Sequence, residues 1–496
     1  MEKAVTGKAF DEHRNPGPRH MARWLFWGFC AAAAVVGLFT ANGLITSACF
    51  LALPLMVILV WRQGEPPVLL FACTFQWLQT TAAVFYTNQK GVTLEEAFGS
   101  NELTVATWLS IIGVVALAAG IRCAFLGAGE PKQIELEREA ANLDVRKAGM
   151  LYIAAFIFST LILFVARHFW SASQIIGAFA SAKWAAVFLL CYTTLYQRRG
   201  YRLLVGCLCL EFATGLFGIF SDFKSVFFVL IVAALSSPAA LRGRRLAAMV
   251  VCMVVLLITG VAWSSIKMDY RAFLVDEMSG PEETVPVERK FDKLSDLVQS
   301  ITWENLADGF DALVLRVSYV NFFALTLENV PTRVPYEDGA LWKDAVTRVF
   351  MPRVFFPSKS LLDDSERTRM YTGVNVAGME SNTSIGIGYF GESYIDFGPI
   401  FMFVPIFLLG MFYGLINRLF ITRTRYKLLG SAFAVAVLIF NAYAVESSNA
   451  KLVGGTLSVT LACGAMYVLF GPAVMQFLRR AGPPPLAWLP ATTPEA

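Results

Sequence analysis

Histidine, charged residues and known catalytic motifs are all scarce in this 496-residue sequence. The three histidines, His13, His20 and His168, are too few for a histidine-rich metal site, and they make a Ser-His-Asp triad improbable. No Walker A, HExxH, CxxC or Gly-x-Ser-x-Gly motif occurs, so an ATP-driven pump and the common soluble enzyme classes are not indicated. We therefore expect no metal, no cofactor and no nucleic-acid partner.

Charged residues make up only 16% of the chain, whereas soluble domains carry roughly a quarter. Hydrophobic residues make up 56% and gather in blocks of about 18–22 residues, the length that crosses a bilayer core. The sequence thus predicts an all-α polytopic membrane protein with about twelve transmembrane helices. The predicted spans are 24–41, 43–61, 67–86, 103–124, 150–168, 174–196, 203–220, 225–241, 246–266, 397–417, 428–445 and 452–473.

The nine cysteines lie in or at the edges of these apolar blocks, and none lies in the long polar segment 267–396. A disulfide-stabilised exported domain is therefore not expected. The first 23 residues are polar and basic and lead directly into the first apolar block, without a small-residue cleavage site. We interpret this start as a cytoplasmic tail followed by a retained first helix.

The distribution of lysine and arginine predicts the orientation, because short cytoplasmic loops collect these residues. With the N-terminus inside, the short outer loops contain only Lys90, Arg167, Lys224 and Lys451. The inner segments contain many more, among them Arg62, 122–147, 198–202, 242–245, 418–427 and 479–480. Both termini are expected in the cytoplasm of a bacterial cell, with the protein as a multi-pass component of the inner membrane.

Five segments follow from this topology. They are a cytoplasmic basic tail (1–23), transmembrane helices one to nine (24–266), a large periplasmic loop (267–396), transmembrane helices ten to twelve (397–473) and a cytoplasmic proline-rich tail (474–496). The loop contains apolar helical patterns at 289–301, 305–329 and 340–350, so we expect it to be mostly helical and to fold over the membrane helices as a cap.

A basic cluster in this loop is the first candidate site. It comprises Arg348, Arg353, Lys359, Arg367 and Arg369. Arginine offers a planar fork of donors that suits pyrophosphate oxygens, so the cluster is typical of a site for a lipid pyrophosphate head group.

The alternative is a solvated loop whose arginines pair with Asp363, Asp364 and Glu366. Arg271 and Arg316 are further candidates; Arg316 lies in a largely apolar helix, where an unpaired buried charge would be costly.

The stretch 386–398, which runs into the tenth predicted span, is the second candidate. Tyr389, Glu392 and Asp396 are spaced i, i+3 and i+7 and so share one helical face at the outer mouth of the membrane. A carboxylate there can act as a general base toward a sugar hydroxyl. Alternatively, Tyr389 and Tyr394 anchor the helix at head-group depth.

Two charges lie inside predicted spans, Lys183 in the sixth and Glu211 in the seventh. Intramembrane charges are rare and usually paired or functional. Because the two helices are consecutive, we expect an ion pair that fixes helix packing; a proton or ion relay is the alternative.

The order of motifs from Arg316 to the tenth span resembles a known family. ENVPTRVPYEDG is followed by MPRVFFPSK, by Asn382-Thr383-Ser384, and by G-x-G-x-x-G-E-x-Y-x-x-F-G at the mouth of a late membrane helix. This pattern, over roughly 316–417, resembles the Wzy-type O-antigen and exopolysaccharide repeat-unit polymerases. The rest of the chain is similar in helix count and in having a large late loop.

The resemblance implies a membrane glycosyltransferase. Such an enzyme joins undecaprenyl-pyrophosphate-linked oligosaccharide repeat units at the periplasmic face, with membrane lipid, a chain-length regulator and a flippase as further partners. It implies catalytic roles for Glu392, Arg353 and Arg316. Substrate binding is implied for Lys359, Arg367, Arg369, Arg271, Arg348, Tyr389 and Asp396.

Three other classes remain open, one of which is a non-catalytic scaffold of an export machine. An O-antigen ligase-like glycosyltransferase would be expected to carry a histidine in the large loop, and 267–396 has none. A polysaccharide or lipid transporter would be expected to show inverted repeats and broken helices at mid-membrane.

Overall fold

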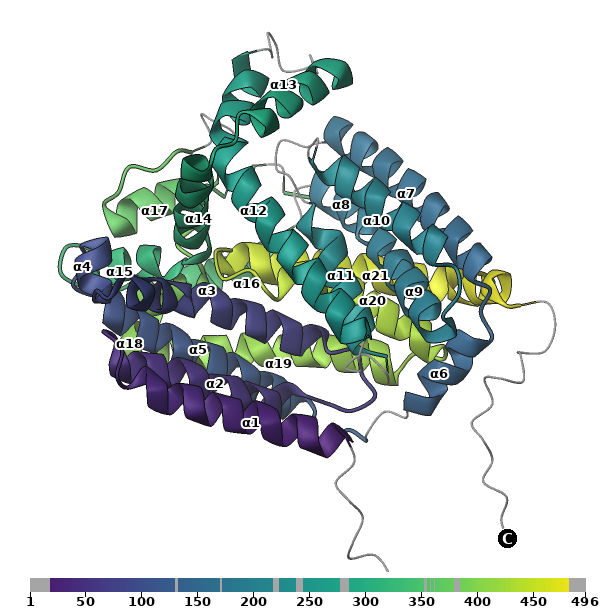
Figure 1. Cartoon of the computed structure of the whole chain (residues 1–496), viewed down its shortest axis with the longest axis horizontal. Helices are drawn as coiled ribbons and strands as arrows, with labels where there is room; N and C mark the ends of the chain where they lie inside the picture. Colours follow the sequence, from purple (N-terminus) through teal and green to yellow (C-terminus); the bar gives the residue numbers. More distant parts are fainter. Residues whose placement is uncertain are drawn as a thin grey trace, which may run out of the picture.

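The computed structural model describes residues 18–129, 133–169, 172–216, 223–237, 244–276, 285–351, 355–356, 358–360, 362–378 and 384–480. Within these ranges every regular secondary-structure element is a helix (Figure 1). A single isolated β-bridge joins Leu143 to Arg479. The first part of the bundle contains α1 (Pro18–Gly37), α2 (Gly43–Val60), α3 (Val68–Lys90), α4 (Leu94–Phe98), α5 (Leu103–Ala124), α6 (Gln133–Ala141) and α7 (Val145–His168).

The middle of the chain forms a second set of helices. It contains α8 (Ser173–Ala180), α9 (Ala182–Gln197), α10 (Tyr201–Leu216), α11 (Lys224–Leu235), α12 (Arg244–Asp276), α13 (Val287–Gln299), α14 (Trp303–Val317) and α15 (Val320–Asn329). The last part contains α16 (Ala340–Val349), α17 (Asp364–Thr372), α18 (Tyr389–Phe401), α19 (Phe403–Thr422), α20 (Lys427–Asn441) and α21 (Asn449–Leu478).

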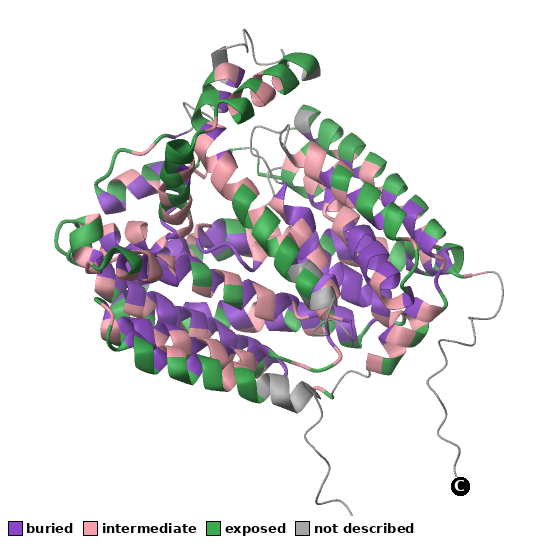
Figure 2. Ribbon diagram, in the orientation of Figure 1, coloured by how far each residue is buried: buried purple, intermediate pink, exposed green. Residues whose placement is uncertain are grey.

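Eight helical stretches of the described chain are long and apolar enough to cross a membrane, or nine if the bent pair α14–α15 counts as one. The eight are α2, α3, α5, α7, α8 with α9, most of α12, α19 and α21. Three other predicted spans coincide with shorter apolar helices, in α1, α11 and α20, and one with the 16-residue α10. Exposed residues follow the outer faces of α1, α7 and α12 (Figure 2). Many of them are large and apolar, such as Phe29, Leu161 and Val251, as expected where helices meet lipid.

The bundle has two ends. One carries α4, α15 and α17 and is called the α17 end below; the other carries α6 and is called the α6 end (Figure 1). At the α6 end, the Glu139 carboxylate accepts hydrogen bonds from the first amides of α20, Lys427 N–H at 2.9 Å and Leu428 N–H at 2.8 Å. This contact satisfies amides that a helix start otherwise leaves unpaired.

The helices α5 and α19 pack most closely, because glycines face the neighbouring backbone. A Cβ atom at Gly120 of α5 would collide with the Phe407 carbonyl oxygen, and one at Gly410 of α19 would collide with that of Leu117. At Gly414 it would lie 2.6 Å from Ala124 Cβ. Gly410 and Gly414 form a Gly-x-x-x-Gly pair, the pattern that lets membrane helices approach each other.

The predicted span 428–445 is interrupted. Helix α20 ends at Asn441, and the buried segment 442–448 is irregular before α21 begins. Two glutamines of α3 hold this segment: Gln76 Nε2 donates to the Ala442 carbonyl at 2.6 Å, and Gln79 Nε2 donates to Glu446 Oε2 at 2.8 Å. Irregular backbone inside such a bundle requires partners of this kind.

The expected pair inside the bundle is confirmed. Lys183 Nζ lies 2.8 Å from Glu211 Oε2, and the Tyr152 hydroxyl donates to the other oxygen of Glu211 at 3.1 Å. The arrangement ties α7, α9 and α10 together.

The helical patterns predicted within 267–396 appear with one correction. The patterns at 289–301 and 340–350 are α13 and α16, but 305–329 is two helices, α14 and α15, bent by 55° at Ser318 and Tyr319. The bend turns α15 onto α5 and α17, whereas α14 lies along α12. Helix α16 packs on α21, so much of this segment lies directly against the membrane-type helices.

The α5–α19 contact yields a stability prediction. Gly120→Ala should lower the unfolding free energy by about 1–3 kcal/mol, because the added methyl group has no room beside Phe407. The control is Gly464→Ala in α21, where a Cβ meets nothing within 4 Å; it should be neutral or slightly stabilising. Thermal unfolding in detergent measures both, and an unchanged Gly120→Ala variant would contradict the close packing.

Candidate functional site

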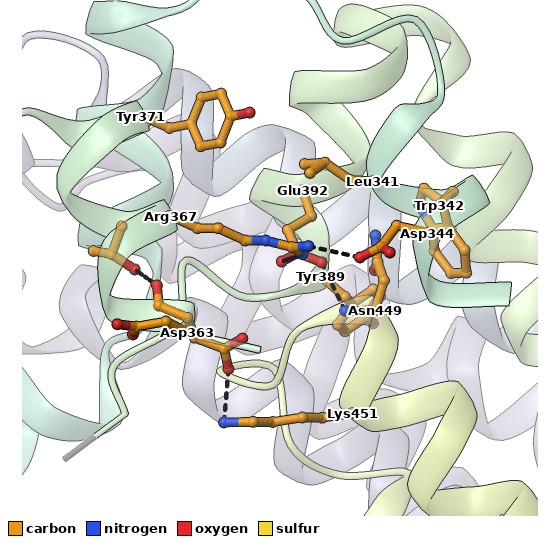
Figure 3. Close-up of polar contacts among 12 residues, drawn as sticks. Leu341, Trp342, Asp344, Asp363, Arg367, Tyr371, Tyr389, Glu392, Asn449 and Lys451 are labelled. Atoms are coloured by element: carbon orange, nitrogen blue, oxygen red, sulfur yellow. Dashed lines mark hydrogen bonds and ion pairs between the residues drawn. The ribbon is translucent and has the colours of Figure 1, made fainter. Parts of the chain in front are cut away.

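A cluster of charged side chains at the α17 end joins α16, α17, α18 and the start of α21 (Figure 3). Glu392, in the first turn of α18, lies at its centre and is only 2% exposed. The chain enters α18 through Gly388, whose φ of +90° suits glycine and whose missing side chain leaves room for the Val445 carbonyl. This turn directs Glu392 between α17 and α21.

The Glu392 carboxylate has two partners. Its Oε2 accepts a hydrogen bond from the Asn449 backbone N–H at 2.7 Å, and its Oε1 lies 3.4 Å from Arg367 Nη1. The Asn449 amide is the first of α21, so the positive end of that helix faces the carboxylate. Burial nevertheless outweighs both partners and raises the pKa of Glu392 to about 7.

Arg367 bridges two carboxylates from different helices. Its Nη2 lies 2.8 Å from Asp344 Oδ2 of α16, while its Nη1 faces Glu392. Arg348, one turn after Asp344, pairs with the same carboxylate through Nε at 2.7 Å. Burial alone would raise the pKa of Asp344, but hydrogen bonds from Arg348 and Arg367 hold it below its usual range. Two guanidinium groups and two carboxyl groups thus form one connected network, with as many basic as acidic side chains.

Lys359 and Ser360 close this network at the end of α16. Lys359 Nζ donates to the Arg348 carbonyl at 2.7 Å and to the Met351 carbonyl at 3.0 Å, which satisfies the carboxyl end of the helix. The Ser360 hydroxyl accepts from Arg348 Nη2 at 2.9 Å. The predicted cluster members Arg348, Lys359 and Arg367 are therefore brought together.

Two of the acidic residues offered as alternative partners of the arginines have other contacts. Asp363 caps α17 by accepting from the Ser365 and Glu366 amides, and Asp364 pairs with Lys451 Nζ at 2.7 Å. The reason is geometric, since the helix turns its first residues toward α21 and its Arg367 toward α16 and α18.

Other predicted site residues have separate positions. Arg369 Nε donates to the Val376 carbonyl at 2.9 Å, and Arg316 is exposed on α14. Asp396 accepts the Leu341 and Trp342 amides at 3.0 and 2.7 Å and so caps α16. Arg353 lies outside the described residues, and Arg271 lies in α12 with its side chain outside the described part.

Tyr389 and Tyr394 are buried, at 0% and 5% exposure, so neither is a head-group anchor. The Tyr389 hydroxyl donates to Gln76 Oε1 at 2.6 Å, below Glu392. The site residues missed by sequence reasoning are Asp344, Asn449, Lys451 and Gln76. Asp344 and Arg348 are four residues apart in a predicted helix, and this spacing could have indicated their ion pair. No feature of the neighbouring sequence indicated a role for Asn449 or Gln76.

An apolar groove of about 470 Å³ lies beside the cluster. Its lining includes Trp342 and Val346 of α16, Phe397 of α18, Leu408 and Phe412 of α19, and Val453 of α21. Lys343 also borders it. Helix α16 therefore contributes one face to the groove and the other, through Asp344 and Arg348, to the charged network.

The fold and the site together define a polytopic α-helical membrane protein with a buried carboxylate–guanidinium centre at one end of the bundle. The sequence matches the model of the family described as Domain of unknown function (DUF8712) over residues 69–445, most of the chain, and the protein belongs to that family. No curated protein and no solved structure matches it significantly.

The burial of Glu392 predicts a pH-dependent stability. The unfolded chain loses this proton near pH 4.5, but the folded protein keeps it to about pH 7, so ionisation opposes folding. Stability should therefore fall as pH rises from about 4.5 to about 7 and level off above. Burial also raises the pKa of Glu65 to about 7, so Glu392→Gln should show a shallower slope than the wild type in thermal unfolding rather than none. Glu366→Gln, an exposed change on α17, should keep the wild-type slope. Identical slopes in all three proteins would contradict the assignment.

Proposed function

We propose that the protein is a membrane glycosyltransferase that polymerises oligosaccharide repeat units carried on undecaprenyl pyrophosphate. The observation that carries this proposal is the buried Glu392 carboxylate, 3.4 Å from Arg367, in a network that shares α16 with an apolar groove. A pKa near 7 suits a general base, since such a group is partly ionised at neutral pH yet basic enough to take a proton.

The proposed reaction needs a base and a site for a departing anion. The acceptor sugar hydroxyl gives its proton to Glu392 while its oxygen forms a bond to the anomeric carbon of the donor. The bond from that carbon to the pyrophosphate breaks, and the lipid pyrophosphate leaves with both electrons. Arg367 and Arg348 stabilise the phosphate oxygens. Because both arginines already pair with Asp344, the phosphate must replace this carboxylate as their partner.

The groove supports a lipid-linked substrate. It combines apolar side chains of the membrane-type helix α19 with those of α16, and Lys343 stands at its border. The phosphate of a hydrocarbon chain in this groove would have to reach Arg348 and Arg367 around α16, because the groove and the arginines lie on different faces of that helix. Long isoprenoid chains match a groove of this lining better than a free sugar does.

The same proposal includes the topology. We propose twelve transmembrane segments in the bacterial inner membrane, with the termini and the α6 end in the cytoplasm and residues 267–396 in the periplasm. The support is the excess of basic residues near the α6 end, such as Arg418 and Lys427. The chain-length regulator and flippase are proposed partners at the periplasmic side and in the same membrane.

Loss of the base should stop polymerisation. Glu392→Gln keeps the shape of the side chain but cannot take a proton, so chain extension should fall about 100- to 10,000-fold. Arg367→Lys keeps the charge but cannot reach Glu392 and Asp344 together, and it should also be impaired. The assay uses purified protein with lipid-linked repeat units from a strain lacking this protein, without nucleotide sugar, and resolves products by length.

Arg333→Lys is the matched control, because Arg333 is exposed and contacts Asn329 away from the cluster. It should form the wild-type product ladder. A wild-type protein that yields no ladder, or a Glu392→Gln variant that yields a normal one, would contradict the proposed function.

Filling the groove should weaken lipid binding. Val346→Trp places a bulky side chain among the lining residues and should reduce the affinity for undecaprenyl pyrophosphate by about tenfold or more, from the cost of overpacking. Native mass spectrometry of the protein released from nanodiscs measures the bound lipid. Val468→Trp, on an exposed part of α21, is the control and should bind normally. Equal binding by both variants would remove the groove from the proposal.

A further inference from the structure

Three residues next to Glu392 contain buried polar atoms with unmet hydrogen-bonding capacity. Asn449 and Ser448 are 0% exposed and Asp364 is 2% exposed. Among the described residues, neither the oxygen nor the nitrogen of the Asn449 side chain has a hydrogen-bond partner, nor does Ser448 Oγ or Asp364 Oδ1. Buried polar atoms are nearly always paired, because leaving them unpaired is costly, so a group of four requires an explanation.

At the start of α21, the missing hydrogen bond of Ser448 is especially unusual. Ser448 is the N-cap residue and has the extended backbone, with ψ of 154°, that normally lets serine cap its own helix. It makes no such bond to the second or third amide of the helix, and the first amide, that of Asn449, donates to Glu392. The Ser448 hydroxyl is therefore left available, although a local partner is close at hand.

The unpaired groups belong to one place. Asn449 is joined to Glu392 through its backbone amide, and Asp364 is joined to Lys451, two residues further along α21, at 2.7 Å. Asp364 and Arg367 lie one turn apart on α17. Figure 3 shows Asn449 beside Glu392 and Lys451 below both of them. The Lys451 side chain is 44% exposed and marks the side on which solvent approaches.

The chemistry of these atoms selects the ligand. Asp364 Oδ1 and Asn449 Oδ1 are acceptors and need hydrogen-bond donors, which a phosphate diester cannot supply. The nearby Glu392 and Asp364 carboxylates also disfavour a second anion. The Asn449 amide nitrogen needs an acceptor, and the Ser448 hydroxyl can both donate and accept. Sugar hydroxyls donate and accept in the same way and match the whole set.

We propose that Asp364, Ser448 and Asn449 bind hydroxyl groups of a sugar and hold the acceptor end of the glycan against Glu392. This inference rests on the proposed function and adds three specificity-determining residues near Glu392. Recognition of the acceptor is thereby separated from recognition of the pyrophosphate, which falls to Arg348 and Arg367.

Saturation-transfer NMR with the full-length protein in nanodiscs tests the sugar site directly. The probes are methyl glycosides of glucose, galactose, mannose and N-acetylglucosamine, and inorganic pyrophosphate as a competitor. At least one glycoside should give a signal that Asn449→Ala and Ser448→Ala abolish. The control Asn441→Ala removes an amide that already donates to the Val437 carbonyl of its own helix, and it should keep the signal.

Thermal unfolding separates binding from folding. An asparagine with no partner in the protein does not stabilise the fold, so Asn449→Ala should unfold at the wild-type temperature or above while losing the glycoside signal. A lowered unfolding temperature with retained glycoside binding would show a structural role and overturn the proposal. So would the absence of binding to every glycoside, or a signal displaced by pyrophosphate.

The outcomes also separate this inference from the proposed function. Glycoside binding requires no lipid donor and no turnover. If wild-type protein extends chains normally and Asn449→Ala leaves the acceptor KM unchanged, the sugar site fails and the polymerase proposal stands. If Asn449-dependent glycoside binding occurs without any chain extension by wild-type protein, the sugar site stands and the polymerase proposal fails.

Discussion

The burial of the Glu392 carboxylate is the constraint on which the α17 end is built. A carboxylate removed from water needs charged or amide donors, and the neighbouring residues of α18 supply none. The donors come from Arg367 of α17 and from the first amide of α21. Three stretches separated in sequence therefore have to meet at one side chain, and the irregular segment before α21 allows that helix to begin at the required place.

Helix α16 connects this centre to the lipid-facing side of the bundle. Asp396 caps its start and Lys359 closes its end, so the helix is fixed at both termini. Between them, Asp344 turns to the arginines and Val346 to the groove. A ligand that enters the groove and one that binds the arginines thus contact the same ten-residue helix, which provides a direct physical route for one to affect the other.

The sequence predicted the helical membrane architecture because apolar block length reports directly on bilayer thickness. It also predicted the Lys183–Glu211 pair, since charges in apolar surroundings must find partners. It grouped Arg348, Lys359 and Arg367 because they lie close together in the sequence of one polar loop. It missed the bend at Ser318 and the break after Asn441, because both depend on partners distant in the chain. Asp344 and Asn449 were missed for the same reason, as their roles come from helix docking.

The two glutamines that contact the irregular segment between α20 and α21 affect which groups near Glu392 can gain or lose protons. Gln76 pairs with the interrupted backbone at Ala442, Gln79 binds the Glu446 carboxylate, and the Tyr389 hydroxyl donates to Gln76. Amides neither gain nor lose protons near neutral pH, so Glu446 is the ionisable group among these four side chains near neutral pH. Acid–base chemistry at Glu392 is therefore bordered by one further carboxylate and by an amide and a hydroxyl that keep their protons.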